Sequence, residues 1–282
     1  MIKRLINYLS DVRDCQRIGI ALSKGAAMMH ARNIDLTKPA TWEFSGFSQN
    51  GEDGILDVLR GQLLNSNRYF IEIGTSDGIE NNSAWLVVAE KYSGIMIEGN
   101  PRLVERANRM VVRYSIGAEC HCMYVTRENV ESLLRMALNQ DPDIFSLDID
   151  GNDYYIAQAV LDGGARPKIF VVEYNSVYGP DQSMTIEYSA NFNFTTAHQT
   201  QLYYGVSITG WRKFFESRGY HFITVDRNGV NAFFVDPNFF DPIFLNGVKG
   251  LKFAENLFQY KKFRMPSRDQ FAFIATQKFT AI

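Results

Sequence analysis

The chain has 282 residues, of which 46% are hydrophobic and 21% are charged, and its formal net charge is −2. This composition is ordinary for a globular protein with a substantial core, and the scattered Lys and Arg residues predict no nucleic-acid partner. No apolar run approaches the ~20 residues that a membrane span needs, and three cysteines are too few for a disulfide framework. We therefore expect a soluble, cytoplasmic protein with no transmembrane segment.

Residues 1–45 predict an N-terminal helical extension. From Tyr69 onward, short apolar runs alternate with helical patterns, which is typical of a parallel sheet with crossover helices. The predicted strands are Tyr69–Ile73, Gly94–Glu98, Glu119–Val125, Ile144–Asp150 and Lys168–Glu173. The predicted helices run from Ser83 to about Tyr92, from Pro101, from Thr126, and from Asn152 to Leu161.

A loop over residues 175–203 follows, and a loop of this length is usually a lid or a binding loop. A helix is predicted over Ser207–Arg218, followed by strands His221–Val225 and Asn231–Val235, which a turn ending in Asn-Gly joins as a hairpin. These elements predict an α/β fold of the Rossmann-like class I methyltransferase type. Its mostly parallel seven-stranded sheet would carry helices on both faces and a C-terminal antiparallel hairpin. Residues 46–237 would form this domain, and the aromatic-rich residues 238–282 would pack on it.

The turn after the first predicted strand runs from Glu72 to Gly78, and Gly74 and Gly78 would let a ligand approach the backbone closely. Glu98 ends the second strand, 20 residues beyond Gly78, where a carboxylate can accept both hydroxyls of a ribose. Glu72 and Asp77 would repel a pyrophosphate but suit the sulfonium and ammonium groups of S-adenosylmethionine. Because the G-x-G-x-x-G pattern is also absent, the sequence predicts S-adenosylmethionine rather than a dinucleotide.

Acidic residues close the fourth and fifth predicted strands. Asp148 and Asp150 follow one strand, and Glu173 and Asn175 end the next. Since the carboxyl ends of parallel strands form the ligand crevice, we expect these side chains to meet there. Asp148, Glu173 and Asn175 could bind Mg²⁺ or Ca²⁺, and a bound cation could lower the pKa of a substrate hydroxyl.

The carboxylates of Asp148, Asp150 and Glu173 could instead act as a general base without metal, or cap the helix that follows. Helix capping is the reading expected for Asp153. His198, in the long loop, is a further catalytic candidate, as a base or a substrate contact, although a solvated loop histidine would also explain it.

Several blocks of the sequence, in order, resemble the FkbM-like methyltransferase family, and more narrowly a branch associated with bacterial surface polysaccharide. The blocks are Ser48–Leu56, Phe70–Gly74, Asp148–Asp153, Val172–Asn175 and Gly229–Phe234. The resemblance implies transfer of a methyl group from S-adenosylmethionine to a hydroxyl of a sugar or natural product.

By this resemblance, Glu72, Gly74 and Gly78 would hold the methionine part of the cofactor, and Glu98 would hold the ribose. Gln49, Asp53 and Asn82 are further cofactor-binding candidates that the resemblance suggests. Ser76 departs from the commoner glycine-rich turn, so the pose of the cofactor is not fixed by the sequence.

The expected function is that of an O-methyltransferase acting on a hydroxyl of a carbohydrate or glycoconjugate precursor, with a divalent metal as a candidate assistant. The partner would be a small-molecule or glycan substrate, and a second copy of the chain could form a homodimer. Two alternatives stay open. One is a metal-dependent nucleotide-sugar glycosyltransferase that uses Asp148-Ile149-Asp150 as a D-x-D motif, and the other is a non-catalytic α/β interaction protein.

Overall fold

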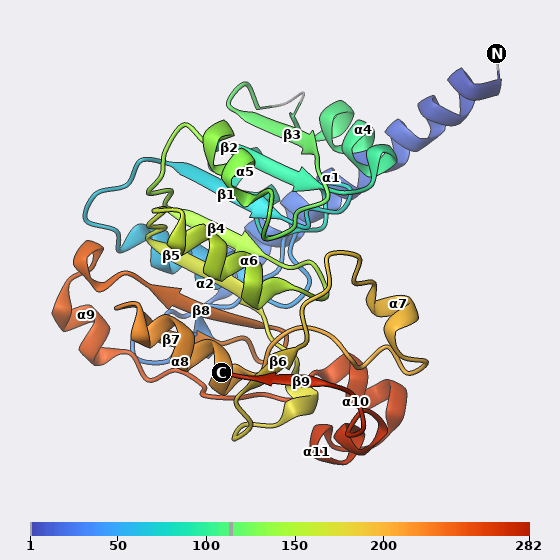
Figure 1. The fold of residues 1–282 in the computed structure, drawn as a ribbon. Helices are drawn as coiled ribbons and strands as arrows, with labels where there is room; N and C mark the ends of the chain where they lie inside the picture. The colour runs from blue at the N-terminus through green and yellow to red at the C-terminus, as the bar shows by residue number, and fades with distance from the viewer. Residues whose placement is uncertain (1, 113–114) are drawn as a thin grey trace.

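The computed structural model describes residues 2–112 and 115–282 and contains a seven-stranded sheet with the order β3-β2-β1-β4-β5-β8-β7 (Figure 1). The strands are β1 (Tyr69–Ile73), β2 (Ser93–Glu98), β3 (Ala118–Cys122), β4 (Ile144–Leu147), β5 (Ile169–Glu173), β7 (His221–Val225) and β8 (Asn231–Val235). Strands β1 to β5 pair in parallel, and β8 runs antiparallel to both β5 and β7. The first five strands keep the doubly wound order 3-2-1-4-5, and an antiparallel hairpin completes the sheet. The predicted class I methyltransferase fold is confirmed.

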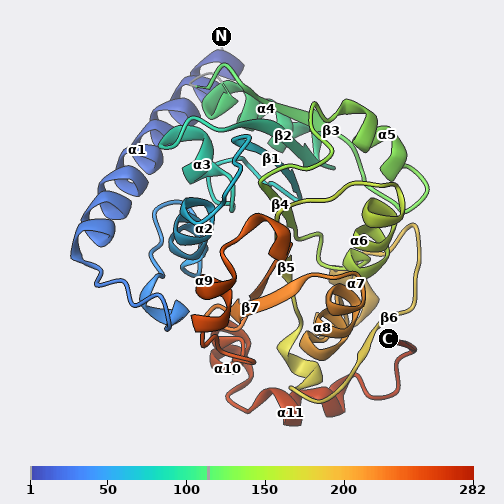
Figure 2. The same ribbon diagram turned by 90° about the vertical axis from the view of Figure 1, so that its left-hand side faces the viewer.

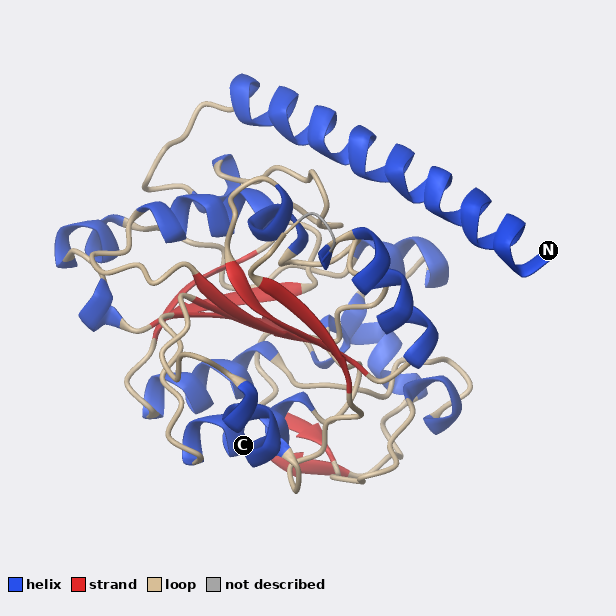
Figure 3. Ribbon diagram, turned by 90° about the horizontal axis from the view of Figure 1, so that it is seen from above, coloured by secondary structure: helices blue, strands red, loops and turns tan. Residues whose placement is uncertain are grey.

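Helices cover both faces of the sheet, which gives three layers (Figures 2 and 3). One hydrophobic cluster joins the sheet to α1 (Ile2–Ala31), α2 (Glu52–Gly61), α3 (Ala84–Val88), α4 (Pro101–Met110) and α9 (Pro242–Gly247). A second cluster joins the opposite face to α5 (Val130–Met136), α6 (Asp153–Asp162) and α8 (Ile208–Ser217). Strands β1, β5 and β8 are buried along their whole length, as expected for strands covered on both faces.

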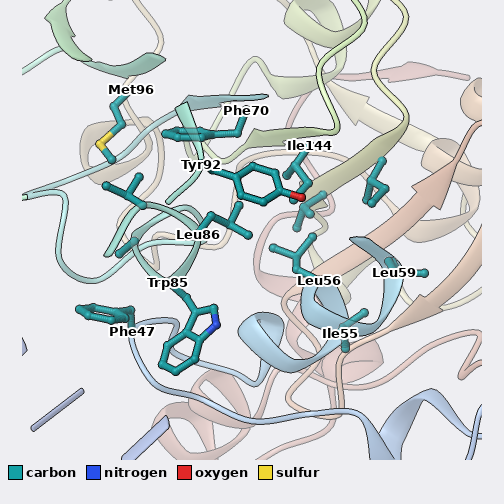
Figure 4. Close-up of a cluster of buried hydrophobic side chains, with 14 of the residues drawn as sticks. Phe47, Ile55, Leu56, Leu59, Phe70, Trp85, Leu86, Tyr92, Met96 and Ile144 are labelled. Atoms are coloured by element: carbon teal, nitrogen blue, oxygen red, sulfur yellow. The ribbon is translucent and has the colours of Figure 1, made fainter. Parts of the chain in front are cut away.

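Trp85 anchors the N-terminal region to the sheet (Figure 4). Its ring lies 5.0 Å from that of Phe44 and 6.2 Å from that of Phe47, measured between centroids. A β-carbon at Gly25 would lie 2.4 Å from Trp85 Cζ3, so α1 can lie on this ring only where it has no side chain. Gly25 thus fixes the position of α1 against the domain.

Several predicted bounds differ from the structure because turns begin earlier than the apolar runs suggest. Strand β4 ends at Leu147, since Asp153 accepts hydrogen bonds from the amides of Ile149 and Gly151 and bends the chain there. The helix expected from Thr126 begins at Val130 instead. The helix expected to reach Tyr92 ends at Val88, and the third strand ends at Cys122 rather than Val125.

The long loop and the C-terminal segment form a second small sheet beside the carboxyl end of the main sheet (Figure 1). The loop contains η3 (Ser176–Tyr178), β6 (Met184–Ile186) and α7 (Phe194–Ala197), and the C-terminal segment contains α10 (Leu257–Phe263), α11 (Ser267–Gln270), η5 (Phe271–Phe273) and β9 (Phe279–Ala281). Two further short 3-10 helices are η1 (Pro39–Thr41) and η4 (Pro237–Phe239). Strands β6 and β9 pair antiparallel over a separate apolar cluster that includes Tyr178 and Ile274. Among the described residues, no helix is long and apolar enough to cross a membrane.

Candidate active site

A cleft of about 1100 Å³ crosses the carboxyl ends of the parallel strands. Its floor includes Ile73 at the end of β1, Glu98 at the end of β2, Asp148 just after β4 and Glu173 at the end of β5. This edge of an open α/β sheet is where ligands bind, because the strand ends and the turns after them point their polar groups there. The long loop and α10 form the walls on the other side.

Gly74 allows the turn after β1 to approach the end of β4. Its φ is +90°, and a β-carbon at this position would lie 1.6 Å from the backbone oxygen of Asp148. The Gly74 amide donates to the carbonyl of Ile97, over 2.9 Å, which ties the turn to β2 as well. The requirement for glycine here is therefore steric, and the exposed backbone of the turn lines the cleft.

Glu98 lies at one end of the cleft and is half-buried. Its Oε2 accepts from the Ser76 amide, over 3.0 Å, and its Oε1 accepts from the Asn100 amide, over 2.7 Å. A carboxylate offers about four lone-pair sites, so Glu98 keeps acceptors for two hydroxyls of a ligand. Met123 and Val125 line the same end and supply apolar surface for a flat ring.

Asp77 lines the cleft, but its charge is compensated. Its Oδ2 lies 2.5 Å from Arg17 Nη1, on α1, and 3.1 Å from Arg106 Nη1, on α4. Burial alone would raise the pKa of Asp77, but the hydrogen bond from Arg17 and the positive charges of both arginines outweigh it and hold the pKa below its ordinary value. The turn is therefore not the uncompensated negative region that its sequence predicts.

Besides Asp53, three of the predicted cofactor-binding residues do not line the cleft. The buried carboxylate of Glu72 accepts from the amides of Asn82 and Ser83, over 3.0 Å and 3.1 Å, and burial raises its pKa to about 7. The Asn82 side chain donates to Ser146 Oγ, over 3.0 Å, and Gly78 faces Ala107. These residues hold the turn in shape from behind, so the structure does not place them in contact with a ligand.

The two other residues that the resemblance suggested lie in different places. Gln49 lines the cleft, and its Nε2 donates to Glu80 Oε1 over 2.9 Å. Asp53 is buried away from the cleft, where its Oδ2 accepts from the amides of Gly46, Phe47 and Ser48. Asp53 therefore organises the loop that carries Gln49.

Three carboxylates meet at the centre of the cleft. One oxygen each from Asp148, Asp150 and Glu173 lies within 4.8 Å of the others. Burial, followed by the negative charges of its neighbours, raises the pKa of Asp148 and of Glu173 well above the ordinary value. Burial and the charge of Asp153 raise the pKa of Asp150 to about 6. Such a cluster is unfavourable when fully ionised, and bound protons or a cation would relieve it.

The donor set of this cluster fits a divalent cation. Glu173 is 8% exposed, and its Oε2 is buried with no hydrogen-bond partner among the described residues. An unpaired buried oxygen is costly, and carboxylate oxygens are the ligands that Mg²⁺ and Ca²⁺ prefer. Asp150, with φ +52°, turns its carboxylate toward those of Asp148 and Glu173.

Asn175 and His198 do not join this cluster. Asn175 is fully buried, and its Nδ2 donates to the carbonyls of Leu202 and Tyr204, over 2.8 Å and 3.0 Å. Its Oδ1 accepts from the amide of Val177, over 3.1 Å. Asn175 therefore stabilises the long loop. Asp150, rather than Asn175, provides the third oxygen of the cluster. His198 Nδ1 contacts Thr200 Oγ1 over 2.8 Å, outside the cleft.

Five residues that the sequence did not indicate also line the cleft, namely Arg17, Phe258, Gln259, Lys261 and Lys262. Arg17 comes from the N-terminal helix, and the other four come from α10. No local pattern marks them, because their approach to the strand ends depends on how the two terminal segments fold back. One spacing in the sequence is consistent with α10, because Lys261 and Lys262 follow Leu257 and Phe258 by four residues, about one helical turn.

No protein-family model matches the sequence, and no curated protein matches it. Solved structures similar to this chain include an O-methyltransferase from Bacillus cereus in complex with SAH (14% identity, 78% of this chain and 89% of that chain, TM-score 0.42). The O-methyltransferase TomG of Streptomyces achromogenes, involved in tomaymycin synthesis and in complex with SAM, is 18% identical over 75% of this chain and 95% of its own, with a TM-score of 0.42. A SAH-bound methyltransferase from Podospora anserina is 13% identical over 60% and 71%, with a TM-score of 0.40. These likenesses are too distant to give any residue of this chain a role.

Proposed function

We propose that this chain is an S-adenosylmethionine-dependent O-methyltransferase. Its acceptor would be a hydroxyl of a carbohydrate or glycoconjugate precursor, and a divalent cation would assist. The observation that carries the proposal is the composition of one cleft, in which the Gly74 turn, the Glu98 carboxylate and the three-carboxylate cluster meet at the strand ends. Several blocks of the sequence also resemble the FkbM-like methyltransferase family, although no family model matches the chain.

At the cofactor end of the cleft, Glu98 would accept hydrogen bonds from both ribose hydroxyls. Met123 and Val125 would contact the adenine, and the exposed backbone at Gly74 would lie along the methionine part. S-adenosylmethionine supplies a methyl group bound to a positively charged sulfur. In this arrangement the methionine chain leads from Glu98 toward the acidic cluster.

At the acceptor end, Asp148, Asp150 and Glu173 would orient the hydroxyl and take up its proton. A general base works best when its pKa lies near the working pH. Burial and Asp153 raise the pKa of Asp150 to about 6, which brings this carboxylate close to that range. A divalent cation, when bound by the cluster, supplies charge that makes the hydroxyl more acidic.

The glycosyltransferase alternative retains one supporting observation. Asp148 and Asp150 both contribute an oxygen to the cluster, as a D-x-D motif that binds a metal and a diphosphate would require. That function leaves Glu98 and the Gly74 turn without a role, which is why we place methyl transfer first. Binding of a nucleotide sugar with Mn²⁺, together with no binding of S-adenosylhomocysteine, would reverse the order.

The test is methyl transfer from S-adenosylmethionine, labelled in its methyl group, to a panel of sugar nucleotides and oligosaccharides in the presence of Mg²⁺. Labelled product is expected, and Asp148→Asn and Glu173→Gln should each lower turnover by about 10²-fold or more. Asp181→Asn changes an exposed acid outside the cleft and should leave turnover unchanged. Full turnover in both cluster variants would contradict the role given to the cluster.

The homodimer stays a prediction. The outer face of α1 leaves Tyr8, Leu9 and Ile20 exposed to 65%, 59% and 68%. By helical spacing, Leu9 and Ile20 lie on the side of α1 away from Gly25, which contacts the domain. A second copy of the chain could cover them, and sedimentation of the purified protein would measure the oligomeric state.

A further inference from the structure

The cleft has room for more than the cofactor. Its volume of about 1100 Å³ exceeds the roughly 300–1,000 Å³ of a typical small-molecule site. The proposed cofactor position uses only the part of the cleft between Glu98 and the acidic cluster. The remaining space lies between that cluster and two walls, the long loop and α10.

Helix α10 is held firmly at this wall. Its N-cap residue, Asn256, accepts from the amides of Phe258 and Gln259, over 3.0 Å in each case. Gln259 Nε2 donates to the hydroxyl of Tyr204, over 3.0 Å, and thereby joins α10 to the long loop. Gln259 is 6% exposed, and its Oε1 is buried without a hydrogen-bond partner in the described part of the chain. Since Gln259 lines the cleft, this free acceptor points to a ligand that carries a hydroxyl.

The same helix turns two cations toward the cleft. Lys261 and Lys262 line it, and neither has a carboxylate within 4.0 Å among residues 2–112 and 115–282. Arg17 is the other cation of the cleft lining, and it is already paired with Asp77 and Glu80. Lys262 Nζ lies 5.2 Å from the centroid of the Phe263 ring, which also lines the cleft. The exposed ring of Phe258 lies one helical turn before Lys262 and offers a flat apolar surface.

We propose that α10 forms an acceptor subsite for the anionic group of a hydroxyl-rich molecule, and this inference rests on the proposed function. Lys261 and Lys262 hold a phosphate or a carboxylate, Gln259 Oε1 accepts from a hydroxyl, and Phe258 contacts a ring face. An acceptor held at its anionic end by α10 can direct its distant hydroxyl toward Asp148 and Glu173, which lie across the cleft. The acceptor class is therefore a sugar phosphate, a nucleotide sugar or a uronic acid rather than a neutral glycan.

The experiment compares three probes by ligand-observed NMR titration of the full chain, loaded with S-adenosylhomocysteine and Mg²⁺. The probes are glucose 1-phosphate, glucuronic acid and methyl glucoside. We expect at least one anionic probe to bind about fivefold more tightly than methyl glucoside, the size expected of charge contacts at an open cleft. The double variant Lys261→Gln/Lys262→Gln should remove that preference, and raised salt should weaken it in the natural protein. The tighter of the two anionic probes identifies phosphate or carboxylate as the group recognised.

The matched control is Lys249→Gln/Lys252→Gln, which removes the same charge from exposed lysines of the C-terminal segment that do not line the cleft. It should keep the preference. The inference is overturned if methyl glucoside binds as tightly as both anionic probes, or if the preference survives in Lys261→Gln/Lys262→Gln. Calorimetric titration of the unloaded protein with S-adenosylhomocysteine separates this from the proposed function. Loss of S-adenosylhomocysteine binding in the natural protein contradicts the methyltransferase itself, whereas intact binding without a lysine-dependent preference contradicts only the subsite.

Discussion

Gly74 lies in the turn after β1, where the chain passes close to the backbone at the end of β4. Its positive φ is one reason for glycine, and the 1.6 Å that would separate an added β-carbon from the Asp148 carbonyl oxygen is another. The positive φ concerns the backbone of Gly74 alone, whereas the close contact concerns the distance between the turn after β1 and the end of β4. A pair of glycine substitutions can distinguish them.

Gly74→Ala should lower the free energy of unfolding by about 3 kcal/mol or more, because the strands must separate as well as accept the strained φ. Gly164→Ala is the matched control, since Gly164 has φ +92° and no atom within 4 Å of its added β-carbon. It should cost only about 1–2 kcal/mol, the penalty for a left-handed conformation. Urea unfolding measures the free energy of unfolding of both variants. Equal losses of stability would show that the turn after β1 can move away from β4 without an added penalty.

The sequence predicted the meeting of Asp148, Asp150 and Glu173 because the ends of parallel strands share one edge of the sheet. It could not predict where Glu72 or Asn175 point. Glu72 lies on a strand whose alternate side chains face opposite layers, and Asn175 lies where the loop turns and captures its side chain. Side-chain direction at the end of a strand depends on contacts distant in sequence.

At the scale of elements, α1 contacts the turn after β1 through Arg17. Arg17 contacts Asp77 over 2.5 Å and Glu80 over 3.3 Å, and it lines the cleft. Arg17→Gln would leave Asp77 with Arg106 as its remaining cation and loosen the turn along which we propose that the methionine part of the cofactor lies. We expect it to weaken S-adenosylhomocysteine binding by about fivefold or more.

Arg109→Gln is the control for α1. Arg109 Nε donates to Asp11, over 3.0 Å, so it joins α4 to α1 without lining the cleft. If docking of α1 alone mattered, both variants would weaken binding equally in calorimetry. If only Arg17→Gln weakens S-adenosylhomocysteine binding, the contacts of Arg17 with the turn are responsible.

The β7–β8 hairpin contains a buried acid that should make stability depend on pH. Asp226 accepts from the amides of Asn228 and Val230, over 2.7 Å and 3.1 Å, and burial together with the charge of Glu52 raises its pKa to about 8. A native pKa above the ordinary value means that the folded chain holds a proton that the unfolded chain has lost. This contribution to stability is fully present at acidic pH, below the ordinary pKa, and is lost as the pH rises through about 8.

The free energy of unfolding of the natural protein should therefore fall between pH 6 and pH 8 more steeply than that of Asp226→Asn. The difference in slope should reach up to about 1.4 kcal/mol per pH unit. Urea titrations of both proteins across this range measure it. A loss of stability that the substitution causes equally at every pH does not change the slope of the free energy of unfolding against pH. Equal slopes for the two proteins would contradict the raised pKa of Asp226.

The sequence placed elements well where local chemistry decides them. The Asn-Gly turn predicted β7 and β8 with their observed bounds, and apolar runs predicted β1. The C-terminal segment could not be assigned, because α10 has seven residues and β9 has three. Elements this short are stabilised by their partners in the fold, here the long loop, rather than by their own pattern.

At the scale of the whole molecule, the cleft combines three regions of the chain. The N-terminal helix provides Arg17, the sheet provides Glu98 and the acidic cluster, and the C-terminal segment provides Lys261 and Lys262. The fold class and the cluster could be predicted because they follow from the order of strands. The walls of the cleft could not be predicted, because they form by contacts between segments that are far apart in the sequence.

The measurement that tests the account most directly is a calorimetric titration of the protein with S-adenosylhomocysteine, with and without Mg²⁺. We predict a dissociation constant in the micromolar range, and a separate Mg²⁺ heat that Asp148→Asn abolishes. An absence of binding in both conditions, from a sample shown to be folded, would contradict the methyltransferase function and favour the nucleotide-sugar alternative.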